Sequence, residues 1–276
     1  MGRASKPALP TVQFSDHGQV RYLHLDSPWV QGSMRIDDPF GIHLEYVQRM
    51  MAGLLFVPLH EVPFQHAMQL GLGAAALTKF CHKHLRCRTT AIEINPQVVA
   101  ACRLWFKLPP DSDRLAVVLG DAAEVAAHNH WRHQIDHLHV DLYDHEAASP
   151  VLDSPEFYGH CRQLLTDVGV MSVNLFGRSM SFGRSLSHIT EAFSDQAVWV
   201  FKPTREGNTV VLALRTPVRP TRTQLAAQAI QIEENGLLCL PPDGCGPCRL
   251  CLESDRSISE TRNLFKFTYS HNQQVQ

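Results

Sequence analysis

The feature that most constrains this chain is a regular alternation of short apolar runs with helix-forming segments between residues 67 and 215. Apolar runs of strand length occur at 67–72, 89–94, 115–120, 137–143 and 169–176, and helix-forming segments follow at 74–85, 96–106, 121–130, 154–166 and 185–193. Counted with the two strands described next, the series has six or seven units, which predicts an α/β fold with a doubly wound, mainly parallel, Rossmann-like sheet. Two further strands, 197–201 and 209–215, flank the turn residues Gly207 and Asn208, which predicts an antiparallel edge pair.

The segments around this series predict four parts of the chain. Residues 1–18 are polar and contain proline, which predicts a disordered tail. Residues 19–56 combine two β-prone runs, 20–25 and 29–36, with a helical pattern at 43–56, so a small N-terminal β-hairpin region and a linking helix are expected. The Rossmann-like nucleoside-binding domain spans 57–216. Residues 217–276 form a C-terminal extension with one helix at 223–237 and a cysteine-rich tail.

The charge balance argues against two classes of partner. Lys and Arg number 25 against 27 Asp and Glu, so no broad basic surface for nucleic acid or an anionic membrane is expected. No apolar run reaches 18 residues, and the first 20 residues lack the apolar core of a signal peptide. We therefore expect a cytoplasmic protein that acts on a small cationic or neutral molecule.

The eight cysteines and 16 histidines raise the question of a metal site. Four cysteines stand singly in apolar or helical contexts, which is typical of buried reduced thiols: Cys81, Cys87, Cys102 and Cys161. The tail holds two CxxC steps and one further cysteine: Cys239, Cys245, Cys248 and Cys251. Zinc or an iron–sulfur cluster uses such spacings. The two steps share Cys248, however, so a separate second CxxC pair is absent and a reduced tail without metal is favoured. The histidines between 128 and 145 lack ligand spacing, and no metal is expected there.

The first strand–helix turn carries Gly71 and Gly73, which allow a tight turn and a close approach of the backbone to a ligand. Glu93 ends the second strand 20 residues past Gly73, the distance at which an acid binds both hydroxyls of a ribose. A plain turn with Glu93 at a helix N-terminus is the alternative. Asp121, which follows Gly120 at the end of the third strand, can accept from an adenine amino group or cap the next helix.

The fourth strand ends in Asp141, Tyr143 and Asp144. A buried carboxylate beside a second one can have a raised pKa and act as a general base toward an amine. In the alternative interpretation Asp141 caps a turn and Asp144 is solvated. Acids at three successive strand ends favour a functional cleft.

These residues together resemble the spermidine synthase (polyamine aminopropyltransferase) family over about residues 19–215. SPWVQ at 27–31 is similar to the family's Ser-x-Tyr-Gln stretch, IDD at 36–38 to Leu-Asp-Gly, and YVQ at 46–48 to Tyr-His-Glu or Tyr-Gln-Glu. LGLGAAA at 70–76 is similar to its glycine loop, IEIN at 92–95 to Glu-Ile-Asp, GDA at 120–122 to Gly-Asp-Gly, and DLYD at 141–144 to Asp-Ser-Ser-Asp. The resemblance implies a class I methyltransferase-type Rossmann fold behind a small β-domain.

The resemblance also implies a reaction in which decarboxylated S-adenosylmethionine gives an aminopropyl group to a small amine such as putrescine. Asp141 is implied to take the proton of the amine, while Tyr143 and Asp144 hold the amine in line. The residues implied to bind the donor are Gln31, Gly71, Gly73, Glu93, Gly120 and Asp121, and those implied to bind the amine are Tyr46 and Gln48. A homodimer is compatible with the sequence.

Three positions depart from the family pattern. Ala74 replaces the acid that anchors the terminal amine of the donor, and Gln48 replaces a glutamate that helps to bind the polyamine. Each loss removes a charge-assisted contact worth about 1.5–3 kcal/mol. Gln69 replaces an acid common in methyltransferases. Two alternatives therefore remain, a methyltransferase that uses S-adenosylmethionine and a nucleoside-binding homologue without catalysis.

Overall fold

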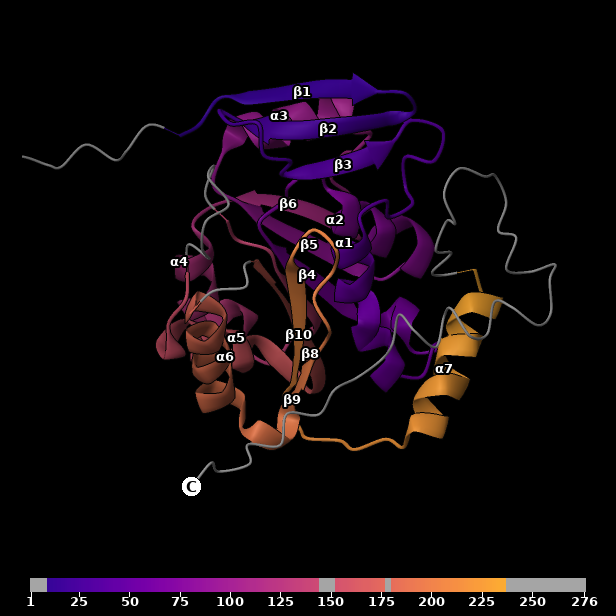
Figure 1. Cartoon of the computed structure of the whole chain (residues 1–276), viewed down its shortest axis with the longest axis vertical. Coiled ribbons are helices and arrows are strands. Elements are labelled where there is room, and N and C mark those ends of the chain that lie inside the picture. Colours follow the sequence, from indigo (N-terminus) through magenta and orange to yellow (C-terminus); the bar gives the residue numbers. More distant parts are fainter. Residues whose placement is uncertain (1–8, 144–151, 177–179, 237–276) are drawn as a thin grey trace, which may run out of the picture.

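The structure, a computed structural model, describes residues 9–143, 152–176 and 180–236. A seven-stranded central sheet has helices on both faces, and a three-stranded antiparallel sheet lies over one end of it (Figure 1). The predicted α/β, doubly wound fold with a small N-terminal β region is confirmed. In the part of the chain that is described, no helix is long and apolar enough to cross a membrane.

The small sheet contains β1 (Val12–His17), β2 (Val20–Leu25) and β3 (Gly32–Arg35). The central sheet contains β4 (His66–Leu70), β5 (Arg88–Glu93), β6 (Leu115–Leu119), β7 (Ile135–Val140), β8 (Leu165–Phe176), β9 (Val198–Val200) and β10 (Asn208–Leu214). The α-helices are α1 (Glu45–Met50), α2 (Ala76–Phe80), α3 (Pro96–Trp105), α4 (Ala122–Ala127), α5 (Pro155–Leu164), α6 (Met180–Phe193) and α7 (Arg222–Glu234). Short 3₁₀-helices are η1 (Met51–Phe56), η2 (Val62–Phe64), η4 (Asn129–Trp131) and η5 (Asp195–Ala197), and η3 (Cys81–Leu85) is a π-helix.

The order of the central strands is β6-β5-β4-β7-β8-β10-β9, so the direction of winding reverses between β4 and β7. Strands β4 to β8 are parallel, whereas β10 pairs antiparallel with both β8 and β9. The antiparallel pairing of β9 with β10 confirms the predicted edge pair. In such sheets ligands bind outside the carboxyl ends of the strands at the reversal point, which here lies between Leu70 and Val140.

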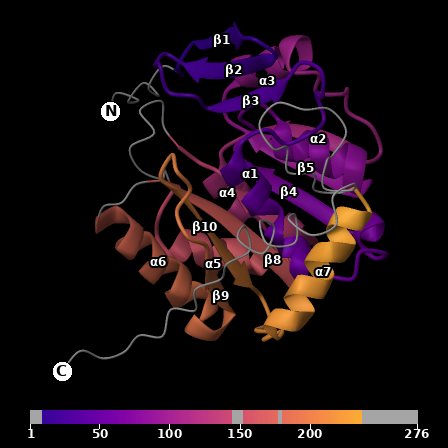
Figure 2. The same ribbon diagram turned by 45° about the vertical axis from the view of Figure 1, so that its right-hand side comes forward.

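Side chains that alternate along each buried strand serve two different cores. On β4, Ala67 packs in the core shared with α1, η1 and α7, while Met68 packs in the core shared with α4, α5 and α6. Figure 2 shows α5 and α6 on one side of the sheet and α1 and α7 on the other. A third core, which includes Leu23 and Leu72, joins the small sheet to α3 and to the turn after β4. The small sheet is thereby fixed over the carboxyl end of β4.

The helices begin where the sequence supplies capping groups. The Asn95 side chain accepts from the Gln97 amide ahead of α3, and Ser154 accepts from the Phe157 amide ahead of α5, each with proline at the first helical position. α7 begins with a reciprocal capping box between Thr221 and Gln224. The predicted helix at 223–237 is thus found as Arg222–Glu234.

Three local expectations differ from the structure. The tail predicted over residues 1–18 contains strand β1, which pairs with β2 across Gly18 at φ +58°. Most side chains of β1 are exposed, so this strand has a polar composition that local patterns do not identify as a strand. The helix expected over 43–56 changes from α to 3₁₀ after Met50, and the helix expected over 74–85 ends in the π-turn η3.

Candidate active site

The turn after β4 is shaped by two glycines in the left-handed region, Gly71 at φ +86° and Gly73 at φ +51°. A Cβ on Gly71 would lie 2.3 Å from the carbonyl oxygen of Asp141, and one on Gly73 would lie 2.9 Å from that of Gln31. Glycine is therefore required at both positions for conformation and for space. The turn lies directly against the end of β7 on one side and against the entry to β3 on the other.

Gln69 and Ala74, the two departures in this turn, serve its internal structure. The Gln69 amide oxygen accepts from the Thr78 amide at 3.2 Å and from the Thr78 hydroxyl, and its nitrogen donates to the Leu72 carbonyl at 3.4 Å. Ala74 is 2 % exposed, and a Cβ on Gly32 would lie only 2.6 Å from its backbone nitrogen. Neither position offers a charged group to a ligand.

Glu93 lies at the end of β5, immediately beside this turn. One carboxylate oxygen accepts from the Leu72 amide at 3.0 Å and the other accepts from the Asn95 amide at 2.8 Å. Burial raises the pKa of Glu93, and these backbone donors oppose that shift. Each oxygen keeps a further lone pair for a hydroxyl donor. The cap of α3 is Asn95, so Glu93 is not the N-cap considered as its alternative role.

Asp121 caps α4, because its side chain accepts from the Ala123 amide at 2.8 Å. This is the capping role that the sequence left open for it. The preceding Gly120 donates its amide to the Glu93 carbonyl at 2.9 Å, which holds the ends of β5 and β6 together. Contact of Gly120 and Asp121 with an adenine ring stays a prediction.

Asp141 follows β7 and receives hydrogen bonds on both carboxylate oxygens. The Tyr46 hydroxyl donates to one oxygen at 3.2 Å, and the Asn174 amide donates to the other at 2.9 Å. Burial raises the pKa of Asp141, while the bonds from Asn174 and Tyr46 lower it. The result is an oriented carboxylate with spare lone pairs at the reversal point of the sheet, as a general base requires.

Tyr143 joins the ends of β7 and β8. Its hydroxyl donates to the Asn174 carbonyl at 3.1 Å and accepts from the Phe176 amide. Burial raises the pKa of Tyr143, so the phenol stays protonated. Tyr143 therefore positions the strand that carries Asn174. Asp144, the second predicted carboxylate, lies outside the described residues.

Asn174 was not predicted from the sequence, yet it is central to the site. Its amide oxygen accepts from the Asn208 side chain at 3.0 Å while its nitrogen donates to Asp141. This forms a buried polar chain from the β9–β10 hairpin to the carboxylate. The signal in the sequence is a carboxamide near the end of a mainly apolar run, since burial of such a group is costly unless it is fully hydrogen-bonded.

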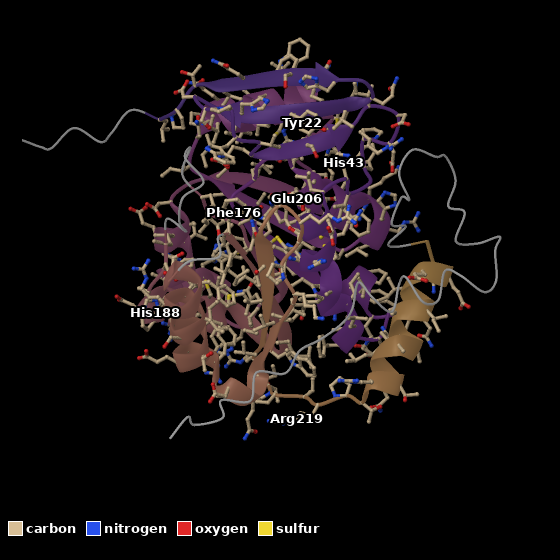
Figure 3. All side chains as sticks on the ribbon, viewed as in Figure 1. Tyr22, His43, Phe176, His188, Glu206 and Arg219 are labelled. Atoms are coloured by element: carbon tan, nitrogen blue, oxygen red, sulfur yellow. The ribbon has the colours of Figure 1, made fainter. Side chains whose placement is uncertain are left out.

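Aromatic side chains border the same end of the sheet. The ring of Trp29, on the connection between β2 and β3, meets the ring of Phe176 edge to face with centroids 6.5 Å apart. Trp29 keeps 52 % of its surface exposed. Phe176 and Glu206 both lie below the small sheet, near the ends of the central strands (Figure 3).

Gln31 and Gln48, the two glutamines implied to bind ligands, differ in their position relative to the glycine turn. The Gln31 carbonyl faces Gly73, so its backbone adjoins the glycine turn, and contact of its side chain with a nucleoside stays a prediction. Gln48 is 7 % exposed and donates its side-chain amide to the Ile42 carbonyl at 2.9 Å. Its side chain is thus engaged within the segment before α1, whereas Tyr46 from the same helix contacts Asp141.

A buried carboxylate behind the site, Asp153, connects α5 with α6. The Tyr158 hydroxyl donates to it at 3.2 Å and the Ser185 hydroxyl donates to it at 2.9 Å. Arg184 and His188 of α6 approach the same carboxylate at 3.5 and 3.7 Å. Asp153 therefore braces the two helices that cover this side of β7 and β8.

Among the described residues, no three histidine, cysteine or acidic side chains are grouped to hold a metal ion. His137 and His139 are buried on β7, where they contact Gln65 at 2.7 Å and Ser172 at 2.8 Å. The four predicted reduced thiols are free and buried: Cys81, Cys87, Cys102 and Cys161. The cysteines at 239, 245, 248 and 251 lie outside the described residues.

Known proteins resemble the chain in sequence and in fold. A polyamine aminopropyltransferase of Neisseria meningitidis is 32% identical over 215 residues, which cover 78% of this chain and 80% of that protein. The structure of a probable spermidine synthase from Corynebacterium glutamicum superposes with a TM-score of 0.66 at 17% identity, covering 86% of this chain and 95% of that chain. Human methyltransferase-like protein 13, in complex with SAH, gives a TM-score of 0.62 at 22% identity, with 75% and 97% covered. No protein-family model matches the chain.

Proposed function

Because this chain belongs to the polyamine aminopropyltransferase family, we propose that it transfers an aminopropyl group from decarboxylated S-adenosylmethionine to a small amine such as putrescine. The observation that carries the proposal is the placement of Asp141. Its carboxylate is oriented by Tyr46 and Asn174, and its backbone adjoins the glycine turn through Gly71.

The residues around the turn suit the nucleoside part of such a donor. Gly71 and Gly73 let the turn lie close against the Asp141 and Gln31 carbonyls, and Glu93 is a buried carboxylate with spare lone pairs beside that turn. An acid in this position accepts both hydroxyls of a ribose. Gln31, Gly120 and Asp121 would complete the binding of the donor.

When bound, the donor supplies an aminopropyl carbon beside a sulfonium, and methylthioadenosine is the leaving group. The protein must deliver the amine in its neutral form, since an ammonium has no lone pair with which to attack. Asp141 accepts that proton, and its hydrogen bonds from Tyr46 and Asn174 hold the oxygens in a fixed direction. Tyr143 keeps the ends of β7 and β8 in register, so that the oxygen that accepts the proton stays fixed while the amine nitrogen attacks the reacting carbon.

This chain should bind the amine groups of its ligands more weakly than the family pattern implies. Ala74 is buried against Gly32 and Gln48 is engaged with Ile42, so neither side chain supplies an anion to the ligand. The two missing charge-assisted contacts, one to the terminal amine of the donor at Ala74 and one to the amine substrate at Gln48, weaken binding by roughly a hundredfold or more in total. KM values in the upper part of the usual range are therefore expected for both the donor and the amine.

Calorimetric titration with decarboxylated S-adenosylmethionine, S-adenosylmethionine and methylthioadenosine tests the proposal, followed by a putrescine turnover assay with the tightest donor. The Asp141→Asn variant should bind methylthioadenosine as the parent does and lose turnover by about 10²–10⁴-fold. Full turnover in Asp141→Asn would show that Asp141 is not the general base. Selective use of S-adenosylmethionine would identify a methyltransferase, and failure of all three compounds to bind at millimolar concentration would end the nucleoside interpretation.

A further inference from the structure

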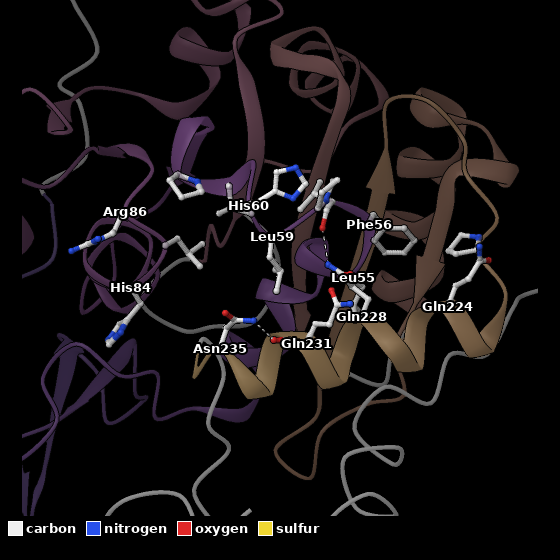
Figure 4. Close-up of a pocket in the computed structure, with 16 residues that line it drawn as sticks. Leu55, Phe56, Leu59, His60, His84, Arg86, Gln224, Gln228, Gln231 and Asn235 are labelled. Carbon is white, nitrogen blue, oxygen red and sulfur yellow. Dashed lines mark hydrogen bonds between the residues drawn. The ribbon is translucent and has the colours of Figure 1, made fainter. Parts of the chain in front are cut away.

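A cavity of about 830 Å³ lies between α7 and η1, away from the candidate active site. Its wall includes Val62, just before β4, and Arg86, just before β5, so it faces the amino ends of the parallel strands. The candidate active site occupies the carboxyl ends. The volume is in the range of small-molecule pockets, and the site proposed above does not use it. We refer to it as the α7 cavity (Figure 4).

The α7 cavity has an apolar floor and one amide-rich wall. Leu55, Phe56 and Leu59 belong to the floor, which the prolines of the following loop extend. The amide wall is a single face of α7 with one carboxamide per turn: Gln224, Gln228, Gln231 and Asn235. Such a combination of apolar surface with a few convergent polar groups is typical of sites for organic ligands.

Internal hydrogen bonds give the carboxamides defined orientations. The Gln228 nitrogen donates to the Leu54 carbonyl at 3.1 Å and to the Val57 carbonyl at 2.7 Å, which leaves its oxygen as an acceptor. The Gln224 oxygen accepts from the amide and hydroxyl of Thr221, which leaves its nitrogen as a donor. The wall therefore presents a donor and an acceptor one turn apart.

The charged groups of the lining are all basic or potentially basic. Arg86, His60 and His84 line the α7 cavity, and no Asp or Glu belongs to the lining. Arg86 follows η3 at φ +59°, and its carbonyl accepts from Arg114 at 2.8 Å, so its backbone is held. Its guanidinium forms no hydrogen bond or ion pair with the residues that the structure describes. A cationic polyamine is disfavoured here, and an anion is favoured.

We propose that the α7 cavity binds an amphipathic organic anion. The apolar body of the ligand rests on Leu55, Phe56 and Leu59, its polar edge meets the carboxamides of α7, and its carboxylate, sulfonate or phosphate pairs with Arg86. The guanidinium fork suits any of these three groups. This site is separate from the one that the proposed transfer uses.

Fluorescence titration of the full chain with 1-anilinonaphthalene-8-sulfonate tests the proposal, because this probe has an aromatic body and one sulfonate. The expected Kd is on the order of 10 µM. N-phenyl-1-naphthylamine, which has the same rings without the anion, should bind more weakly. The Arg86→Gln variant should weaken the sulfonate probe by about tenfold and leave the neutral probe unchanged.

Matched variants control for charge and folding. Gln231→Glu places a carboxylate in the wall and should also weaken the sulfonate probe, whereas Ala227→Glu adds the same charge on α7 outside the lining and should not. Lys107→Gln, which removes an exposed cation elsewhere, is the control for Arg86→Gln. Circular dichroism confirms that each variant is folded. The proposal is overturned if the full chain does not bind the sulfonate probe, if all variants bind it equally, or if methylthioadenosine displaces it.

Discussion

Substitution of Gly71 by alanine should separate the role of the glycine turn from the general cost of a left-handed residue. The new Cβ would lie 2.3 Å from the Asp141 carbonyl oxygen, and ordinary contact begins at 3.4 Å, so the two backbones must separate by about 1.1 Å. Left-handed strain costs about 1–3 kcal/mol and overpacking adds about 1–3 kcal/mol. We expect the free energy of unfolding to fall by about 2–6 kcal/mol.

The same displacement should impair turnover, because it moves the backbone of the proposed base. A misplacement of about 1 Å at a reacting centre can cost about a hundredfold in rate. Urea unfolding followed by circular dichroism measures the stability, and a coupled assay of methylthioadenosine release measures kcat and KM. Turnover is compared at a temperature at which both proteins are fully folded.

Gly18→Ala is the matched control. Gly18 has φ +58° in the turn between β1 and β2, and a Cβ there would meet nothing within 4 Å. This variant should show the strain cost alone, about 1–3 kcal/mol, with kcat unchanged. If Gly71→Ala loses no more stability and no more turnover than Gly18→Ala, the inferred contact between the turn and Asp141 does not constrain the site.

Three further outcomes are expected. Asn174→Ala removes a hydrogen bond to the ionised Asp141, which raises the pKa of that carboxylate, so the acid limb of the kcat/KM profile should move to higher pH; an unmoved limb would contradict the pairing. Burial lowers the pKa of His137 to about 4 and that of His139 to about 3, below the ordinary value of about 6.5. As the pH falls, these histidines therefore bind protons in the unfolded chain before they do so in the folded protein. The free energy of unfolding should decline as the pH falls from about 6.5 toward 4. His137 and His139 together should contribute at most about 2.7 kcal/mol per pH unit to the slope in urea melts, in addition to the contribution of His66, whose pKa burial also lowers to about 4, and His137→Gln should remove about half of the contribution of this pair. Asp153→Asn should lower the free energy of unfolding by about 1–3 kcal/mol with a KM for the amine that is unchanged, whereas a large rise in KM would assign Asp153 to the binding site.

The sheet, and the edge of it that carries the candidate site, follow from local patterns. Buried parallel strands are continuous apolar runs, and capped helices with proline at the first position have clear boundaries, so the order of elements was predictable. The same patterns identified Gly71, Gly73, Glu93 and Asp141, because the carboxyl ends of neighbouring parallel strands must meet.

Other features depend on contacts that local patterns do not contain. β1 is a strand because it pairs with β2, although its exposed side chains are polar. Gln48 donates its side-chain amide to the Ile42 carbonyl, a contact that local patterns do not reveal, and its role toward the amine stays a prediction. Asn174 is one of two polar residues in the run at 169–176, and only the pairing of β8 with β7 and β10 brings it to Asp141 and Asn208.

The partners of Asp141 also have a consequence for biosynthesis. Tyr46 lies 95 residues before the carboxylate and Asn174 lies 33 residues after it, while Asn208 is a further 34 residues along. A nascent chain leaves the ribosome from its N-terminus, so the glycine turn and the carboxylate emerge before β8, the strand whose Asn174 orients the carboxylate. Long-range contacts of this kind form late, since loop closure has to precede them. Acquisition of turnover during synthesis or refolding should thus coincide with completion of the whole sheet, and no fragment that ends before β10 should carry it.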